Sequence, residues 1–147
     1  MTAESDTSNH IYSFKTKINL SVVLPTFNEK KNIQPLIDDL LKLSEVYELE
    51  LIVVDDSSTD GTSSIVRQLA QNDRRIRFIY RVGRAGLSSA IKEGCLCSTG
   101  EILAIMDTDG QHEVNTISSG IKALIEKKLD FVVGSRFLAN SAIRGLS

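Results

Sequence analysis

The chain has 147 residues, of which 41% are hydrophobic and 24% are charged, and its formal net charge is −2. This composition is typical of one soluble globular domain, and the near-neutral charge excludes the broad basic field expected of a protein that binds nucleic acid. No apolar stretch approaches the ~20 residues that a membrane-spanning helix needs. The polar residues 1–17 are predicted to form a flexible tail, and residues 18–147 are predicted to form the folded domain.

Segments typical of strands and of helices alternate from Ile18 onward. Short apolar runs predict strands, and apolar residues spaced three or four apart predict helices. In chain order, the pattern predicts a strand over 20–24, a helix beginning at 32, a strand over 51–55, a helix around 65–69, a strand over 76–80, a helix around 87–95, a strand over 101–106, a helix around 114–125 and a strand over 130–133. This alternation implies right-handed crossovers, and therefore a mostly parallel α/β sheet with helices on both faces.

Acidic residues follow two of the predicted strands. Asp55 and Asp56 end the second strand, and Asp107 and Asp109 follow the fourth. In parallel sheets, ligands bind beyond the carboxyl ends of the strands. Alternate residues of an extended segment point to one side, so Asp107, Asp109 and Gln111 are expected to converge. Oxygen ligands of this kind suit Mg²⁺ or Mn²⁺, and the sequence therefore predicts a metal-dependent site for an anionic substrate.

Two nucleotide-binding designs and a calcium loop are excluded because residues that they require are missing. The chain has no G-x-x-x-x-G-K-[ST] motif, and no G-x-G-x-x-G motif follows the first strand. An EF-hand loop that began at Asp107 would need glycine at its sixth position and glutamate at its twelfth, where the chain has His112 and Ser118. His112 is interpreted as a surface residue or as support for a metal ligand, and not as a ligand itself.

Five motifs resemble, in the same order, those of family 2 glycosyltransferases. They are residues 22–29 (VVLPTFNE), 53–62 (VVDDSSTDGT), 81–87 (RVGRAGL), 106–109 (MDTD) and 134–137 (GSRF). Within that family, the chain is most similar to the dolichol-phosphate (polyprenyl-phosphate) mannosyltransferases. The resemblance implies a GT-A fold that binds a nucleoside-diphosphate sugar. Members of the family are usually longer, so we expect the chain to be truncated and the fold to be incomplete at the C-terminus.

The resemblance also implies which residues bind the donor. Pro25, Phe27 and Glu29 would border the nucleoside, with Asp56 beside the base or the ribose. Arg84 stands where the family often has lysine, so the positive charge is kept but a bidentate fork replaces a point charge.

The metal and the transfer chemistry are assigned in the same way. Asp107 and Asp109 would be the D-x-D pair that holds Mg²⁺ or Mn²⁺ against the diphosphate of the donor, with Gln111 as a third metal ligand. Arg136 would contact the donor phosphates or the acceptor phosphate. Because the diphosphate gains negative charge as the glycosidic bond breaks, Asp107, Asp109 and Arg136 are the expected catalytic residues.

Plainer interpretations of the same residues stay open. Asp56 and Asp60 could cap the helix that follows them, and Glu29 could be a first-turn acid of its helix. Residues 107–110 could be a simple turn, and the two arginines could be solvated surface charges.

The predicted reaction is an inverting transfer of a hexose, with mannose from GDP-mannose as the favoured donor, to a polyprenyl phosphate such as dolichyl or undecaprenyl phosphate. A phosphate monoester is largely dianionic at neutral pH and is already a competent nucleophile. The alternatives are transfer to a saccharide hydroxyl, which needs a general base, and a donor-binding fragment without turnover. A phosphoacceptor receiver domain is disfavoured, because its acidic pair follows the first strand and a lysine follows a late strand.

A lipid acceptor has a consequence for the cellular location of the protein. We expect a cytoplasmic location, with peripheral contact at the cytoplasmic face of a membrane. No pattern in the sequence predicts an oligomeric state.

Overall fold

The part of the chain that the structure describes contains four strands and four helices. The structure is a computed structural model and describes residues 17–111 and 113–134. The strands are β1 (Asn19–Thr26), β2 (Glu48–Asp55), β3 (Ile76–Tyr80) and β4 (Ile102–Ile105). The helices are α1 (Ile33–Leu41), α2 (Thr62–Asn72), α3 (Leu87–Cys97) and α4 (Asn115–Glu126), and the short 3₁₀ helix η1 (Lys42–Glu45) follows α1.

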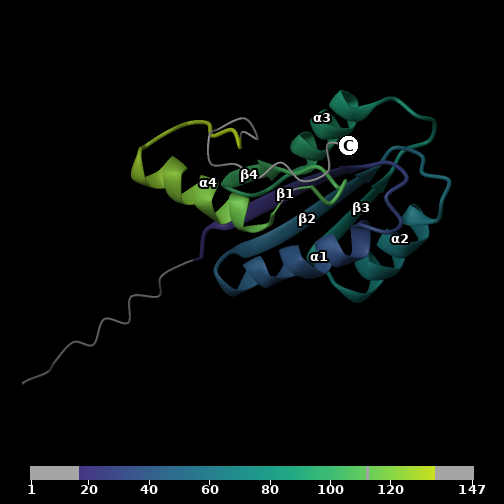
Figure 1. The fold of residues 1–147 in the computed structure, drawn as a ribbon, viewed down its shortest axis with the longest axis horizontal. Coiled ribbons are helices and arrows are strands. Elements are labelled where there is room, and N and C mark those ends of the chain that lie inside the picture. Colours follow the sequence, from purple (N-terminus) through teal and green to yellow (C-terminus); the bar gives the residue numbers. More distant parts are fainter. Residues whose placement is uncertain (1–16, 112, 135–147) are drawn as a thin grey trace, which may run out of the picture.

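The strands form one sheet in the order β3-β2-β1-β4, and all neighbouring pairs are parallel. Side chains at alternate positions of each strand reach opposite faces. In β1, Val22 and Leu24 belong to one cluster, together with residues of α1, α2 and α4. Val23, which lies between them, belongs to a second cluster with Ala90 of α3. Helices therefore cover both faces of the sheet (Figure 1), as the alternating sequence pattern predicts.

Gly94 allows α3 to lie unusually close to the sheet. A Cβ atom at this position would lie 2.4 Å from Cγ1 of Val23 and 3.1 Å from Cγ2 of Val54. Real Cβ atoms do not approach a neighbouring carbon so closely, because interiors are already packed to crystal-like density. The glycine thus fixes the distance between α3 and the strands β1 and β2, and with it the position of the loop that precedes α3.

The strand predicted over 130–133 is wrong. Residues 131–134 are not in a strand, and the side chains of Phe131 and Val133 are 78% and 68% exposed. The apolar run over 131–133 has a high propensity for β structure, but a strand also needs a neighbouring strand that supplies hydrogen bonds. Within the described residues, β4 pairs with β1 alone. The other predicted elements are all present, with ends that differ by a few residues.

Several predictions fall on residues that the structure does not describe. The tail over residues 1–16, His112, Arg136 and residues 137–147 lie outside the described residues. Lys17, the last residue of the predicted tail, donates a hydrogen bond from Nζ to the carbonyl oxygen of Ser44 in η1 at 2.6 Å. In the described ranges, the helices are too short or too polar for any of them to span a membrane.

Candidate functional site

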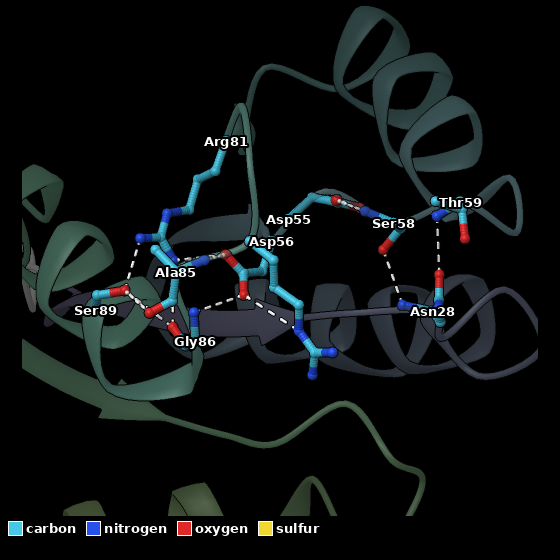
Figure 2. A network of polar contacts seen from close by, with 10 residues as sticks. Asn28, Asp55, Asp56, Ser58, Thr59, Arg81, Ala85, Gly86 and Ser89 are labelled. Carbon is cyan, nitrogen blue, oxygen red and sulfur yellow. Dashed lines mark hydrogen bonds and ion pairs between the residues drawn. The ribbon is translucent and has the colours of Figure 1, made fainter.

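The loops that follow β1 and β2 are joined along the carboxyl edge of the sheet. Asn28 is central to this junction: its backbone N–H donates to Ser58 Oγ at 2.8 Å, and its Oδ1 accepts from Thr59 N at 2.9 Å (Figure 2). Asn28 has a φ of 53°, a left-handed conformation that asparagine tolerates better than most residues. Further along, Lys30 N donates to Asp60 Oδ2 at 3.1 Å. The two loops therefore form one continuous surface.

Asp55 and Asp56 leave the end of β2 toward opposite faces of the sheet, as adjacent strand residues do. Asp55 is fully buried and stabilises the loop before α2 and the first turn of this helix. Its carboxylate accepts hydrogen bonds from Ser58 N at 2.7 Å and from Ser63 Oγ at 3.1 Å. Asp56 instead turns toward the loop before α3, where its Oδ1 accepts from Ala85 N at 3.0 Å and its Oδ2 from Gly86 N at 2.8 Å. The interpretation of Asp56 as a cap for the next helix, α2, is therefore wrong.

Two arginines complete the surroundings of Asp56. Arg81 Nη1 lies 2.9 Å from Asp56 Oδ1, and its side chain is only 11% exposed. Arg84 Nε lies 3.9 Å from Asp56 Oδ2. Burial on its own would raise the pKa of Asp56, but the Ala85 and Gly86 amides and the two arginines outweigh it and lower the pKa below its ordinary value. Asp56 is therefore an ionised anchor for the 81–86 loop.

The sequence motifs assign no role to Arg81, although its side chain is more buried than that of Arg84, the other cation beside Asp56. It also pairs with Glu93 of α3 through an Nε–Oε2 distance of 3.1 Å. Its Nη2 donates to Ser89 Oγ at 2.6 Å (Figure 2). Its position directly after β3, at the edge where parallel sheets bind ligands, was the available signal. Sequence alone could not show that Arg81 faces inward.

Asp60 supports the start of α2, as the plainer interpretation predicted. Its Oδ1 accepts from Thr62 N at 2.9 Å and from Thr62 Oγ1 at 2.6 Å. The residue at the N-cap itself is Gly61, which has a φ of 100° and makes no side-chain cap bond. Burial tends to raise the pKa of Asp60, but the hydrogen bonds from Thr62 and Lys30 lower it overall.

The residues expected around the nucleoside lie at the end of β1. Pro25 is buried, whereas Phe27 and Glu29 are half-buried. The guanidinium of Arg84 covers the ring of Phe27, with Cζ 3.8 Å from the ring centroid. Glu29 Oε2 accepts from Asn32 Nδ2 at 2.8 Å, so this acid also supports the residue that precedes α1. The interpretation of Glu29 as a first-turn acid is wrong, because α1 begins at Ile33 and has no acidic residue in its first turn.

The D-x-D segment follows β4 at the same edge of the sheet. Thr108, between the two aspartates, is buried and donates from Oγ1 to the carbonyl oxygen of Pro25 at 3.2 Å. The chain bends over 108–110, so the alternation rule that predicted convergence holds only up to Asp107. Asp107 Oδ1 accepts from Thr108 N, and Asp109 Oδ1 accepts from Gln111 N, both at 2.9 Å.

This segment fits a metal that is shared with a substrate. Within the described ranges, no group of three or more His, Cys, Asp or Glu residues could hold an ion on its own. Mg²⁺, however, is commonly held by one or two carboxylates together with substrate phosphates. Asp107 is exposed and Asp109 half-exposed, and no hydrogen bond from a described residue reaches the Oδ2 atom of either one. The carboxylates of Asp55 and Asp56 already accept hydrogen bonds from other parts of the protein, so we do not count them among the metal ligands.

Comparisons with known proteins show the family to which the chain belongs. The family model for glycosyl transferase family 2 matches residues 21–145. A dolichol-phosphate mannosyltransferase of Saccharomyces cerevisiae is 36% identical over 123 residues, which are 82% of this chain and 45% of the relative. A dolichol-phosphate mannosyltransferase of Mycosarcoma maydis is 34% identical over 132 residues, or 86% of this chain and 45% of the relative. The chain thus spans about half the length of these curated relatives.

A solved structure gives the same result in three dimensions. A mannosyltransferase from Pyrobaculum calidifontis, in complex with GDP-Man and Mn²⁺, superposes with a TM-score of 0.65 and 30% sequence identity. The match covers 75% of this chain and 33% of the other. The sheet and helices described above therefore belong to the GT-A fold, as the resemblance predicted.

Proposed function

Because the chain belongs to glycosyl transferase family 2, we propose that it takes part in transferring a hexose from a nucleoside-diphosphate sugar to a polyprenyl phosphate. The proposed donor is GDP-mannose, and the proposed outcome is inversion at the anomeric carbon. The names of the relatives support both the mannosyl donor and the polyprenyl acceptor. A lipid acceptor would place the reaction at a membrane surface, for which we propose the cytoplasmic face.

One observation carries this proposal. The hydrogen bond from Thr108 to the Pro25 carbonyl ties the D-x-D segment to the end of β1, where Phe27 and Arg84 lie stacked. A nucleoside beside Phe27 and a diphosphate beside Asp107 would therefore fall along one edge of the sheet. In this arrangement Pro25, Phe27, Glu29, Asp56 and Arg84 border the nucleoside.

Asp107, Asp109 and Gln111 would hold Mg²⁺ or Mn²⁺ on the phosphates. The bound metal would stabilise the negative charge that gathers on the leaving diphosphate. The buried Thr108, which lies between the two aspartates, ties this segment to β1, and each aspartate uses only Oδ1 in its hydrogen bond to a described residue. Arg136 is proposed to add positive charge near the donor or acceptor phosphate.

The acceptor needs no general base in this reaction. An oxygen of the phosphate dianion attacks the anomeric carbon, the new carbon–oxygen bond forms on the face opposite the leaving group, and the nucleoside diphosphate departs with the electrons of the broken bond. Saccharide hydroxyls would need a base within hydrogen-bonding reach. Lipid phosphate is therefore the acceptor that requires least from this part of the chain.

A transfer assay tests the proposal. The 147-residue chain is incubated with radiolabelled GDP-mannose, Mn²⁺ and either a short polyprenyl phosphate or free sugars. We expect label in the lipid phosphate, none in EDTA, and a loss of at least ~10²-fold in Asp109→Ala. Asp38→Ala, an exposed aspartate of α1, is the matched control and should retain transfer. Label in sugars but not in lipid would replace the proposal with a polysaccharide-type transferase.

Donor binding without turnover is the second candidate. It is favoured by the finding that the chain spans 45% of the length of its curated relatives. Calorimetry separates the two candidates: metal-dependent binding of GDP-mannose without any labelled product would support the donor-binding role. Binding that is equally strong in EDTA would contradict the metal-bridged site in either case.

A further inference from the structure

We propose that Thr108 is a positioning residue: its hydroxyl holds the D-x-D segment at a fixed distance from the end of β1, so that one metal ion can bind the two aspartates and the donor diphosphate together. The inference rests on the proposed function and deepens it, because it names the side chain that couples metal binding to nucleotide binding. It is carried by three features of the described residues: the way the β1–β4 ladder ends, the burial of the hydroxyl, and the place of Thr108 between Asp107 and Asp109.

The backbone ladder between β1 and β4 ends before it reaches Thr108. Val23 and Ile105 are the last pair in its register, and Met106 N then donates to the carbonyl oxygen of Val23 at 3.0 Å. In a parallel ladder, the carbonyl oxygen of Met106 would accept the next hydrogen bond from the amide of residue 25. Residue 25 is proline, which has no N–H group, so the backbone pairing cannot continue there.

The Thr108 hydroxyl takes the place of the following backbone hydrogen bond. A ladder that continued would join the amide of Thr108 to the carbonyl oxygen of Pro25. Instead, Thr108 Oγ1 donates to that carbonyl oxygen at 3.2 Å, and the Thr108 amide donates to Asp107 Oδ1 at 2.9 Å. Because a side chain makes the connection, the backbone can bend over 108–110 while the segment remains tied to β1.

The contact between Thr108 and Pro25 is enclosed by the protein. Thr108 is 1% exposed, and Pro25 is buried. A buried carbonyl oxygen that loses its donor stays desolvated without compensation, which is costlier than the loss of a hydrogen bond at the surface. Thr26 provides a comparison, because it is 2% exposed and its Oγ1 donates to the carbonyl oxygen of Leu24 at 3.1 Å. Thr26 thus makes the same kind of buried hydrogen bond within β1, without a link to the D-x-D segment.

The link is important because a bridging metal ion has two sets of ligands. Asp107 and Asp109 belong to the segment after β4, whereas the proposed nucleotide site lies at the end of β1. One ion binds both sets only when the carboxylates and the diphosphate are the right distance apart. If the segment were not tied to β1, ligand binding would have to order it. That cost would reduce the factor by which the metal and the nucleotide strengthen each other's binding.

Calorimetry measures this coupling without any transfer reaction. The 147-residue chain is titrated with GDP in Mn²⁺ and in EDTA, and the ratio of the two affinities is the metal-dependent gain. In Thr108→Val the gain should fall roughly 3- to 10-fold, as expected for one lost hydrogen bond, while the affinity in EDTA stays within about twofold of the parent. Thr108→Ser keeps the hydroxyl and should retain the gain. Thr26→Val is the matched control and should also retain it.

Thermal unfolding of each variant separates positioning from stability. If Thr108→Val does not unfold cooperatively, Thr108→Ala removes the same hydroxyl without burying a methyl group in its place, and the same loss of gain is expected. An undiminished gain without the hydroxyl, an equal loss in Thr108→Ser or Thr26→Val, or an equal weakening in Mn²⁺ and in EDTA would each overturn the inference and leave the proposed function intact. A parent chain that binds GDP no more tightly in Mn²⁺ than in EDTA would contradict the metal-bridged site, and the proposed function with it.

Discussion

The carboxylate of Glu50 provides a quantitative test of how the sheet is held together at the end opposite the site. Glu50 Oε1 accepts hydrogen bonds from Ser21 Oγ at 2.6 Å and from Thr99 N at 2.6 Å, and Oε2 accepts from Arg77 Nη1 at 2.9 Å. One side chain thus joins β1, β2, β3 and the connection from α3 to β4. We predict that replacing Glu50 with glutamine weakens all of these links together.

The magnitude follows from the pKa. Burial by itself would raise the pKa of Glu50, but the hydrogen bonds from Ser21, Thr99 and Arg77 lower it from 4.5 to about 2. Such a difference corresponds to at most about 3 kcal/mol of folding stability. Glu50 is 17% exposed and Arg77 41% exposed, so solvent screening reduces the expected value to about 2 kcal/mol. Because the pKa is lower in the folded state, this stability is present above pH 4.5 and is lost as the pH falls toward 2.

Urea denaturation of the parent and of Glu50→Gln measures this difference. At pH 7 the variant should have a free energy of unfolding lower by about 2 kcal/mol, and the gap should close between pH 4.5 and about pH 2. Glu48→Gln, the same change at an exposed position of β2, is the matched control and should cost less than about 0.5 kcal/mol. A gap that stayed constant as the pH fell would show that shape, and not charge, makes Glu50 important.

Three further predictions concern stability, measured by urea or thermal unfolding. Gly94→Ala should cost about 2 to 3 kcal/mol because the added methyl group collides with β1, whereas Gly120→Ala in α4, which meets nothing closer than 3.9 Å, should be neutral or stabilising. Lys128→Gly should stabilise by about 0.5 to 1 kcal/mol, because Lys128 lies just past the end of α4 with a φ of 52°. Asp60→Ala should cost about 1 to 2 kcal/mol, since two backbone amides lose their acceptor.

Each of these predictions has an outcome that would contradict it. A fully stable Gly94→Ala protein would mean that α3 can move away from the sheet without loss. Lys122→Gly, inside α4, should lower the free energy of unfolding by about 1 kcal/mol. An equal loss in Lys128→Gly would contradict the left-handed backbone conformation of Lys128 at the end of the helix. An unchanged Asp60→Ala protein would show that water replaces the carboxylate at the junction of the two loops.

The order of strands and helices could be predicted because each element carries its own periodic pattern. The run Leu51 to Val54 is buried on both faces, as expected of a central parallel strand, and α1 shows its apolar face at helical spacing. The segment 131–133 has the composition of a strand yet lies exposed among the described residues. A strand forms only when a neighbouring strand supplies hydrogen bonds, and a local sequence pattern does not show which neighbours are present.

The site could be located but its contacts could not. The rule that ligands bind at the carboxyl edge of a parallel sheet placed Asp56 and Asp107 correctly on that edge. It did not show that Arg81 turns inward, or that Arg84 lies on Phe27, a residue far earlier in the chain. Such contacts depend on how two loops fold against each other, and loops have no repeating pattern to read.

Asp55 and Asp56 show why this distinction matters for function. They are chemically identical neighbours at the end of the same buried strand. Strand alternation sends Asp55 toward α2, where it satisfies serine donors inside the fold, and Asp56 toward the loop that carries Arg84. One carboxylate therefore stabilises a helix, and the other holds the loop that carries Arg84 at the edge of the proposed donor site. The parity of a residue along its strand, together with the loop that it contacts, decides which of two chemically identical side chains lies beside the candidate site.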